Sequence, residues 1–179
     1  MTRYVAFLRA LNVGGHVVKM DRLKKLFEAL GLANVRTFIA SGNVLFDSAA
    51  KDPGALEKKI SRHLEKELGY EVATFIRSAA ELQRIAACAP FPDTAITPGA
   101  RVYVGFFADE FGPAARKTAL AFGTDDDDFH ADQRELFWLC RIALLDSAVS
   151  SNKLEKTLGR ATFRNVNTIR RIAAIFAES

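Results

Sequence analysis

The sequence predicts an α+β fold made of two similar halves. Short apolar runs typical of strands alternate with longer stretches in which apolar residues recur at helical spacing. Glycine- and proline-containing segments separate these elements. The order strand-helix-strand-strand-helix occurs twice, without residue-level identity between the halves. This order is that of a ferredoxin-like unit, so we expect two βαββα-type halves with antiparallel sheets, plus C-terminal helices.

The first half is expected to span residues 1–77. Its opening strand, Tyr4–Leu8, is apolar at every position, as in strands that are covered on both faces. A helix is expected from about Asp21, as its N-cap, to Leu30. The remaining elements of this half are strands at 35–40, 44–47 and 72–76 and a helix from Pro53 to Leu68 that Gly69 ends.

Residues 78–100 are expected to hold a short helix, which Ser78 caps, and a proline-containing connection. The second half is assigned to residues 101–160, with strands at 102–107, 128–131 and 135–140 and helices at 113–122 and 151–158. Residues 161–179 form a C-terminal segment with a helix from about Asn165 to Ala177. All parts are expected to belong to one compact unit.

The composition is typical of a soluble globular protein, with 49% hydrophobic and 26% charged residues among 179. A net charge of +4 is too small to indicate nucleic-acid binding by itself. Between residues 150 and 171, however, the sequence contains six basic residues and a single acidic one, Glu155. This segment favours an anionic partner, or alternatively forms a solvated helix face.

The two cysteines, 52 positions apart, favour a reducing compartment, and we expect a cytoplasmic protein. The N-terminal apolar run lacks a signal-peptide pattern, and no apolar stretch is long enough to span a membrane. Cys140 lies in an apolar strand, where we expect a buried, unreactive thiol.

No cofactor or metal is expected. The three histidines, His16, His63 and His130, are scattered, and the run Asp125–Asp128 is expected to be a solvated loop. No nucleophile motif is present. Whether the protein is an enzyme stays open; if it is one, transfer chemistry on an anionic substrate fits these absences.

Polar residues cluster at two turns of the first half. The first group follows the opening strand and the second forms a hairpin turn; they comprise Arg9, Asn12, Gly14, Gly15, Lys19, Ser41, Gly42 and Asn43. A glycine turn between a strand and a helix, with Lys19 nearby, offers backbone N–H groups to a phosphate. It matches no established phosphate-loop motif, so a structural turn is the alternative.

A second polar cluster surrounds the start of the last helix. Its members are Lys153, Arg164, Asn165, Asn167 and Thr168. An anion could bind there through the helix N-terminus and the Arg164 guanidinium. The alternative is an elaborate cap in which Thr162 or Asn165 satisfies the helix and Arg164 pairs internally.

Four segments, Phe7–Gly15, Val35–Phe46, Lys153–Leu154 and Ala161–Thr168, resemble the bacterial family known only as domain of unknown function 1697. The family usually has a tryptophan where this chain has Val166, so a large stacking ring is absent here. The resemblance implies paired ferredoxin-like halves with C-terminal helices and no established activity. It directs attention to the residues of both polar clusters, without assigning them roles.

Three functions remain open. The first is a site for a small phosphorylated or carboxylated ligand, in one cleft where both polar clusters converge. The second is nucleic-acid binding through strand aromatics such as Tyr4, Phe7, Tyr103, Phe106 and Trp138, which would require an exposed sheet face. The third is a structural or protein-interaction module, for instance a homodimer, in which the polar residues serve turns and caps. No membrane partner is expected.

Overall fold

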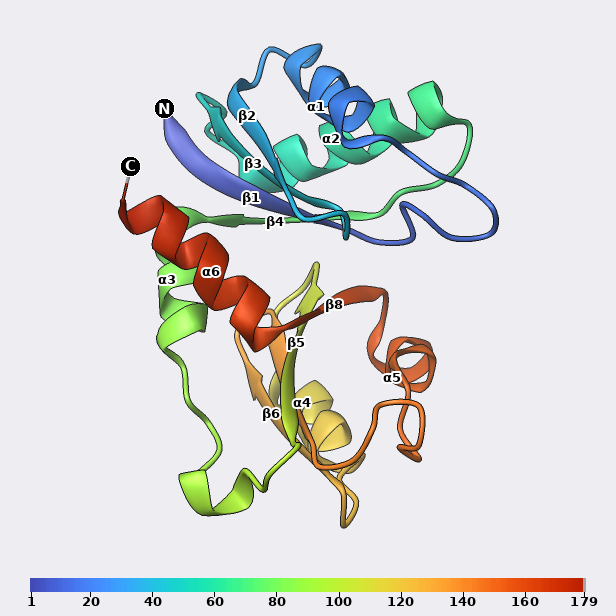
Figure 1. Cartoon of the computed structure of the whole chain (residues 1–179), viewed down its shortest axis with the longest axis vertical. Helices are drawn as coiled ribbons and strands as arrows, with labels where there is room; N and C mark the ends of the chain where they lie inside the picture. Colours follow the sequence, from blue (N-terminus) through green and yellow to red (C-terminus); the bar gives the residue numbers. More distant parts are fainter. Residues whose placement is uncertain (179) are drawn as a thin grey trace. The chain divides into compact units, whose positions relative to one another are not determined.

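The computed structural model describes residues 1–178 and has the α+β fold that the sequence predicts. The chain divides into two compact units, Met1–Gln83 and the part from Arg84 onward. Each unit contains one four-stranded antiparallel sheet with helices packed against it (Figure 1). The fold class is therefore confirmed, with one ferredoxin-like sheet in each unit.

The first unit is built around its first strand. Its elements are β1 (Thr2–Leu8), α1 (Met20–Glu28), β2 (Ala33–Phe38), β3 (Asn43–Ser48), α2 (Pro53–Leu68) and β4 (Thr74–Ser78). The strand order is β2-β3-β1-β4, so β1 lies between two neighbours. Helix α3 (Ala79–Ala87) follows β4 directly and contains the boundary between the units.

Both faces of β1 are buried, as its unbroken apolar run predicts. Tyr4, Ala6 and Leu8 belong to the core that the sheet forms with α1 and α2. Val5 and Phe7 point to the opposite face, because side chains alternate along a strand, and both are 0% exposed. The two aromatic residues of this strand, Tyr4 and Phe7, are thus both buried.

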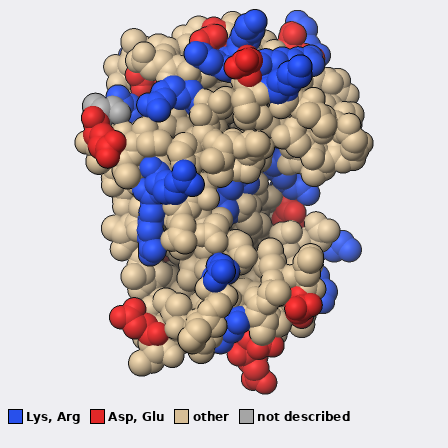
Figure 2. Space-filling view, viewed as in Figure 1, with Lys and Arg blue, Asp and Glu red and all other residues tan. Residues whose placement is uncertain are grey.

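The solvent side of α1 and α2 is rich in basic side chains (Figure 2). Residues 1–83 contain 13 Lys and Arg against 9 Asp and Glu, whereas the rest of the chain contains 12 of each. The net charge of +4 therefore belongs to the first unit. The basic C-terminal segment is balanced by acidic residues elsewhere in its own unit.

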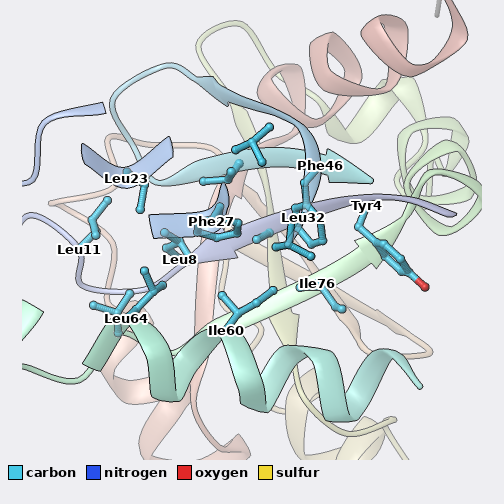
Figure 3. Close-up of a cluster of buried hydrophobic side chains, with 14 of the residues drawn as sticks. Tyr4, Leu8, Leu11, Leu23, Phe27, Leu32, Phe46, Ile60, Leu64 and Ile76 are labelled. Atoms are coloured by element: carbon cyan, nitrogen blue, oxygen red, sulfur yellow. The ribbon is translucent and has the colours of Figure 1, made fainter. Parts of the chain in front are cut away.

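The first core lies between the sheet and the two helices (Figure 3). Leu23 and Phe27 of α1 and Ile60 and Leu64 of α2 are 0% exposed. The Phe27 ring lies 5.6 Å from that of Phe46 on β3. Burying each such side chain contributes about 1.5–3 kcal/mol, so these residues fix both helices on the sheet.

The two helices of this unit begin in different ways. Asp52 caps α2, because its Oδ1 accepts hydrogen bonds from the N–H groups of Gly54 and Ala55 at 2.9 and 3.1 Å. The predicted N-cap of α1 is wrong: Lys19 occupies that position, and no side chain caps the helix. Asp21 lies instead in the first turn, where a carboxylate is favoured by the helix dipole.

The second unit repeats the topology of the first. Its elements are a 3₁₀ turn η1 (Asp93–Ala95), β5 (Arg101–Phe107), α4 (Pro113–Leu120), β6 (Asp127–Asp132), β7 (Glu135–Cys140), α5 (Ser151–Leu158), β8 (Ala161–Asn165) and α6 (Val166–Ala177). The strand order β6-β7-β5-β8 corresponds strand by strand to that of the first unit. Helix α6 packs on β5 and β8.

Strand β8 is absent from the sequence-based assignment, which places residues 161–165 in the C-terminal segment before its helix. The strand has only five residues, and its polar side chains resemble a helix start. The side chains of β8 nevertheless alternate regularly between the two faces of the sheet. Ala161 and Phe163 face the core of this unit, and Thr162 and Arg164 lie on the other face.

The second core is centred on Trp138, which is 1% exposed. Its ring stacks on Phe129 at 5.7 Å and meets the edge of Phe163 at 6.0 Å. The Phe163 ring lies against Gly105 of β5, where an added Cβ would be 2.5 Å from the nearest ring carbon. Glycine at this position is therefore required by the ring that covers it.

We predict that Gly42→Ala destabilises the protein more than Gly69→Ala. Both glycines have a positive φ, +77° and +82°. A Cβ at position 42 would also lie 3.1 Å from Cβ of Leu8, whereas nothing lies within 4 Å at position 69. We expect the free energy of unfolding to fall by about 2–3 kcal/mol for Gly42→Ala and by about 1 kcal/mol for Gly69→Ala. Urea denaturation measures both, and equal losses would show that the contact with Leu8 is unimportant.

Candidate functional site

Two polar turns of the first unit meet beside the end of β1. The N–H of Leu8 donates to the carbonyl of Gly42 at 2.8 Å, which holds the β2–β3 turn against the strand end. Asn12 then joins the two segments: its Nδ2 donates to the Ala40 carbonyl at 3.3 Å, and its Oδ1 accepts the Val18 N–H at 2.9 Å. The segment 9–19 and the turn 39–43 therefore form one polar surface, which we call the turn surface.

A tight turn lies at the tip of segment 9–19. Gly14 and Gly15 have φ values of +62° and +84°, and the His16 N–H donates to the Val13 carbonyl at 3.2 Å. Positive φ at both central residues defines a type I′ turn, which glycine adopts without strain. The geometry of this turn therefore explains both glycines without a ligand.

Tyr70 holds this segment from the side. Its hydroxyl donates to the Leu11 carbonyl at 2.7 Å, and its ring stacks on His16 with ring centroids 3.9 Å apart. Burial raises the pKa of Tyr70, and the positive charge of Arg22 partly offsets this effect. Tyr70 therefore stays protonated at neutral pH and remains a hydrogen-bond donor.

The turn at 39–43 is closed by a buried amide. Asn43 is 0% exposed, and its Nδ2 donates to the Phe38 carbonyl at 3.0 Å and to Oγ of Ser41 at 2.8 Å. Ile39 has a φ of +50°, which is rare for a β-branched residue. The backbone strain at Ile39 persists because Asn43 holds the turn closed.

Basic groups lie around the turn surface. Lys19 and His16 are exposed, and Arg9 is half-buried, with its backbone N–H donating to the Ala73 carbonyl at 2.8 Å. Arg22 donates from Nη2 to the Glu67 carbonyl at 3.1 Å, which links α1 to the end of α2. Helix α1 begins directly after segment 9–19, and no side chain caps its first N–H groups.

The second polar cluster lies in the second unit, and the side chains of Lys153, Arg164 and Asn165 bond backbone groups there. Asn165 is the N-cap of α6, with its Oδ1 accepting the Asn167 N–H at 2.9 Å. Lys153 donates from Nζ to the Ala148 carbonyl at 2.6 Å. The cap predicted as the alternative to an anion site is thus present, and Thr168 lies half-buried in the first turn of α6.

Arg164 is held within its own strand. Its Nη1 donates to Oγ1 of Thr162 at 2.8 Å and to the Phe163 carbonyl at 2.9 Å. Burial lowers the pKa of Arg164 to about 10, so the guanidinium is still protonated at neutral pH. A charge buried in this way requires the acceptors that the strand provides.

The structure therefore divides the predicted residues between the units. Those at the turn surface are Arg9, Asn12, Gly14, Gly15, Lys19, Ser41, Gly42 and Asn43, and those around the start of α6 are Lys153, Arg164, Asn165, Asn167 and Thr168. Each group is assembled within its own unit. That the two groups converge on one ligand stays a prediction.

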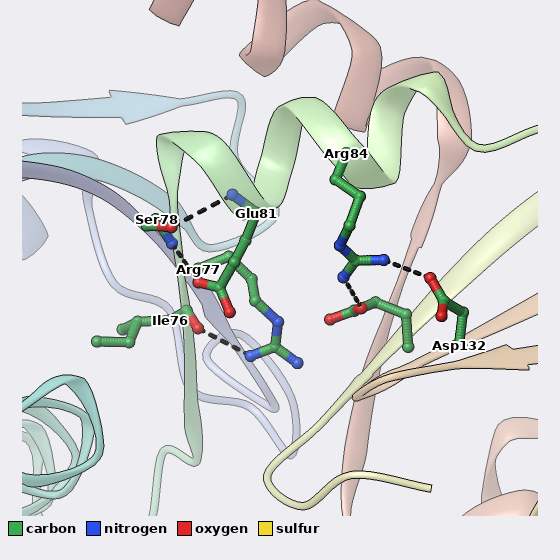
Figure 4. Close-up of polar contacts among 7 residues, drawn as sticks. Ile76, Arg77, Ser78, Glu81, Arg84 and Asp132 are labelled. Carbon is green, nitrogen blue, oxygen red and sulfur yellow. Dashed lines mark hydrogen bonds and ion pairs between the residues drawn. The ribbon is translucent and has the colours of Figure 1, made fainter.

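Arg77 is a buried arginine that sequence reasoning missed. It is 0% exposed, and its Nη1 donates to the carbonyl of the preceding Ile76 at 2.8 Å (Figure 4). It is the counterpart of Arg164: Arg77 pairs in register with Val5 of β1, and Arg164 pairs with Val104 of β5. The only signal was a charged residue directly after the apolar pair Phe75-Ile76.

The residue after each of these arginines caps a helix. Ser78 accepts the Glu81 N–H at Oγ, and the Glu81 carboxylate accepts the Ser78 N–H at 2.8 Å, which is a capping box (Figure 4). Asn165 has the corresponding position before α6. The pairs Arg77-Ser78 and Arg164-Asn165 are thus equivalent, although the surrounding residues differ.

Two buried carboxylates of the second unit were also missed. Arg84 of α3 pairs with Asp132 and with Glu135, and Glu135 is 1% exposed (Figure 4). Asp127 is 0% exposed and accepts hydrogen bonds from Trp138 Nε1 at 2.8 Å and from Ser147 Oγ. The run Asp125–Asp128 is therefore only partly a solvated loop, because Asp127 belongs to the start of β6.

The two cysteines have raised pKa values. Cys140 is 0% exposed, and burial raises the pKa of its thiol, as expected for an unreactive cysteine. Cys88 is half-buried, and burial, followed by the negative charge of Asp132, raises its pKa. Within residues 1–178, no three His, Cys, Asp or Glu side chains lie close enough together to hold a metal ion. No helix in the same range is long and apolar enough to cross a membrane.

A family model for proteins of unknown function, DUF1697, matches residues 1–137, which is most of the chain. The chain belongs to the DUF1697 family. The match contains the whole turn surface and ends before the cluster around the start of α6. Val166 lies outside the matched residues and is 6% exposed at the start of α6.

A solved structure supports the fold of this DUF1697 protein. The conserved bacterial protein SP0830 from Streptococcus pneumoniae is 21% identical to it, over 97% of each chain, with a TM-score of 0.71. At this identity the likeness concerns the fold alone. No curated protein matches the chain.

We predict that Asn12→Ala loosens the turn surface of this DUF1697 protein without unfolding it. The substitution removes both bonds that join Val18 and Ala40 through the side chain. We expect amide hydrogen exchange to accelerate in residues 10–19 and 39–42 and to stay unchanged in β1 and α2. Asn152→Ala is a suitable control, because Asn152 is an exposed residue of α5 in the other unit. Unchanged exchange in both segments would show that Asn12 does not join them.

Proposed function

We propose that the turn surface of the first unit binds a small anionic ligand that carries a phosphate or a carboxylate. The observation that carries this proposal is the uncapped N-terminus of α1, beside a glycine turn that Asn12 holds in place. Free N–H groups and the positive end of the helix dipole attract an anion at such a position.

One side chain strengthens the positive field there, because Lys19 is exposed at the N-cap of α1. His16 is held beside it by its stacking on Tyr70. Asn12, Asn43 and Tyr70 act as positioning residues in this proposal, because their polar groups already bond the backbone. Asp21 opposes it, since its carboxylate lies in the first turn of the same helix.

A thermal-shift screen with inorganic phosphate, sugar phosphates, nucleotides and small carboxylates tests the proposal. A ligand at a hundred times its Kd adds about 2.7 kcal/mol, and each kcal/mol raises Tm by about 2–4 °C in a protein of this size. We expect Lys19→Gln to reduce the shift and Asp21→Asn to increase it. Lys24→Gln is the control, because it removes one positive charge from the same helix, as Lys19→Gln does. It also breaks the ion pair of Lys24 with Glu28.

The result that would contradict the proposal is specific. If no compound shifts Tm, or if Lys19→Gln and Lys24→Gln change the shift equally, the N-terminus of α1 is not an anion site.

A second candidate function is a protein-interaction module. Val13 and Val17 are 55% and 82% exposed on segment 9–19, and Ile39 is 45% exposed on the adjoining turn. Large apolar side chains at a turn that is held in a strained form are costly to keep in water unless they contact something. The candidate partner that this chain itself offers is a second copy, in a homodimer.

Light scattering of the purified protein tests this candidate. If segment 9–19 forms a dimer contact, Val17→Asp will convert a dimer into a monomer, whereas Leu145→Asp will not, because Leu145 is 98% exposed in the other unit. A monomer for the unchanged protein, at concentrations well above those in cells, would exclude the homodimer.

A further inference from the structure

Helix α2 carries a row of cations along its solvent side. Lys58, Arg62 and Lys66 are exposed and are spaced four residues apart, so they lie on one face of the helix, with Lys59 beside them. With a rise of 1.5 Å per residue, neighbouring members are about 6 Å apart along the axis and the row is about 12 Å long. The row of these four residues is called the α2 basic row below.

The cations of the α2 basic row are not neutralised within the protein. Among residues 1–178, none of the four side chains of the row takes part in an ion pair or a hydrogen bond. Like charges four residues apart destabilise a helix slightly. Glu65, three residues after Arg62, is the acidic residue that flanks the row on its exposed side.

The surroundings of the row add to its field. The first unit holds the whole net charge of the chain, and Arg22, Lys24 and Lys25 are exposed on α1, which packs beside α2. The two helices together contain seven basic and five acidic residues, and a positive excess of this kind attracts anionic macromolecules over distances of about 10 Å at moderate salt.

The chemistry of this face distinguishes between anionic partners. The exposed large apolar residues of the described chain include Met1, Val13 and Ile39, and none lies on α1 or α2. A helix that lies in a lipid surface needs such residues to insert between the acyl chains. Single-stranded nucleic acid is held by aromatic side chains that stack on bases, and neither helix exposes one.

A double helix fits these properties better. It presents regularly spaced phosphates that lysine and arginine can contact without reading bases. A duplex carries one phosphate per about 1.7 Å of its axis when both strands are counted, so four cations within about 12 Å can each contact a different phosphate. We propose that the α2 basic row docks on the phosphate backbone of double-stranded nucleic acid, independently of sequence. This goes beyond the anion site proposed above, because it uses other residues and another class of partner.

Fluorescence anisotropy with a short labelled duplex tests this proposal. With four phosphate contacts, the slope of log K against log[salt] is expected to be about −3.6 between about 50 and about 200 mM salt. The triple variant Lys58→Gln, Arg62→Gln, Lys66→Gln should bring this slope to about −0.9 and weaken binding at low salt by at least about tenfold. Glu65→Gln should strengthen binding, because it removes the acidic residue beside the row.

The matched control removes three exposed cations from the other unit. Lys117→Gln, Lys156→Gln, Arg170→Gln lowers the net charge by the same amount and should leave affinity and slope close to those of the unchanged protein. The substituted side chains are exposed in both triple variants, so the fold should hold, and equal Tm values would verify this.

Three results would overturn the proposal. The unchanged protein could fail to bind the duplex at about 100 µM, the weak end of non-specific affinities. The two triple variants could weaken binding equally, which would show an effect of net charge alone. Vesicles of anionic lipid could bind through the row while the duplex does not, which would make the partner a membrane surface.

Discussion

The first strand imposes the main constraint on this protein, because it has no polar face. Five consecutive apolar residues, Tyr4–Leu8, can be kept from water only in the middle of a sheet with cover on both sides. The strand accordingly lies between β3 and β4, and helices α1 and α2 cover one of its faces. The polar groups of the segment that leaves this strand are then confined to its end, where the turn surface forms. The burial of β1 thus determines where this unit can present polar chemistry.

The residues that stood out as polar motifs act mainly on the backbone. Asn12 and Asn43 bond carbonyl and N–H groups of neighbouring turns, and Asn165 caps a helix. Side chains used in this way hold a surface in shape and are poorly available to a ligand. The groups that remain available are those that the turns present, namely backbone N–H groups, Lys19 and exposed apolar side chains. This distinction separates the residues that build the turn surface from those that would contact a partner.

Most of the fold could be predicted because its elements follow simple periodicities. Helix α2 keeps an i, i+4 row of Leu56, Ile60 and Leu64 between a proline and a glycine, and its predicted bounds are confirmed. Strand β8 could not be recognised, because its five residues include three polar ones and gain their partners only by pairing with β5. The burial of Asp127 could not be predicted either. Nothing local shows that Trp138, eleven residues away, brings a hydrogen-bond donor to it. The candidate site was recognised as two groups of residues, but pattern alone cannot show that one group is joined through Asn12.

The contact between Gly105 and Phe163 has a consequence for how related sequences can vary. The ring occupies the space that a side chain on β5 would need, so the two positions share one volume across a pair of strands. A relative that gains a larger residue at the position of Gly105 should carry a smaller one at that of Phe163, and the reverse exchange should occur as well. A larger residue at position 105 therefore requires a change at position 163. An alignment of the family should therefore show these two columns changing together, although they lie 58 residues apart in the chain.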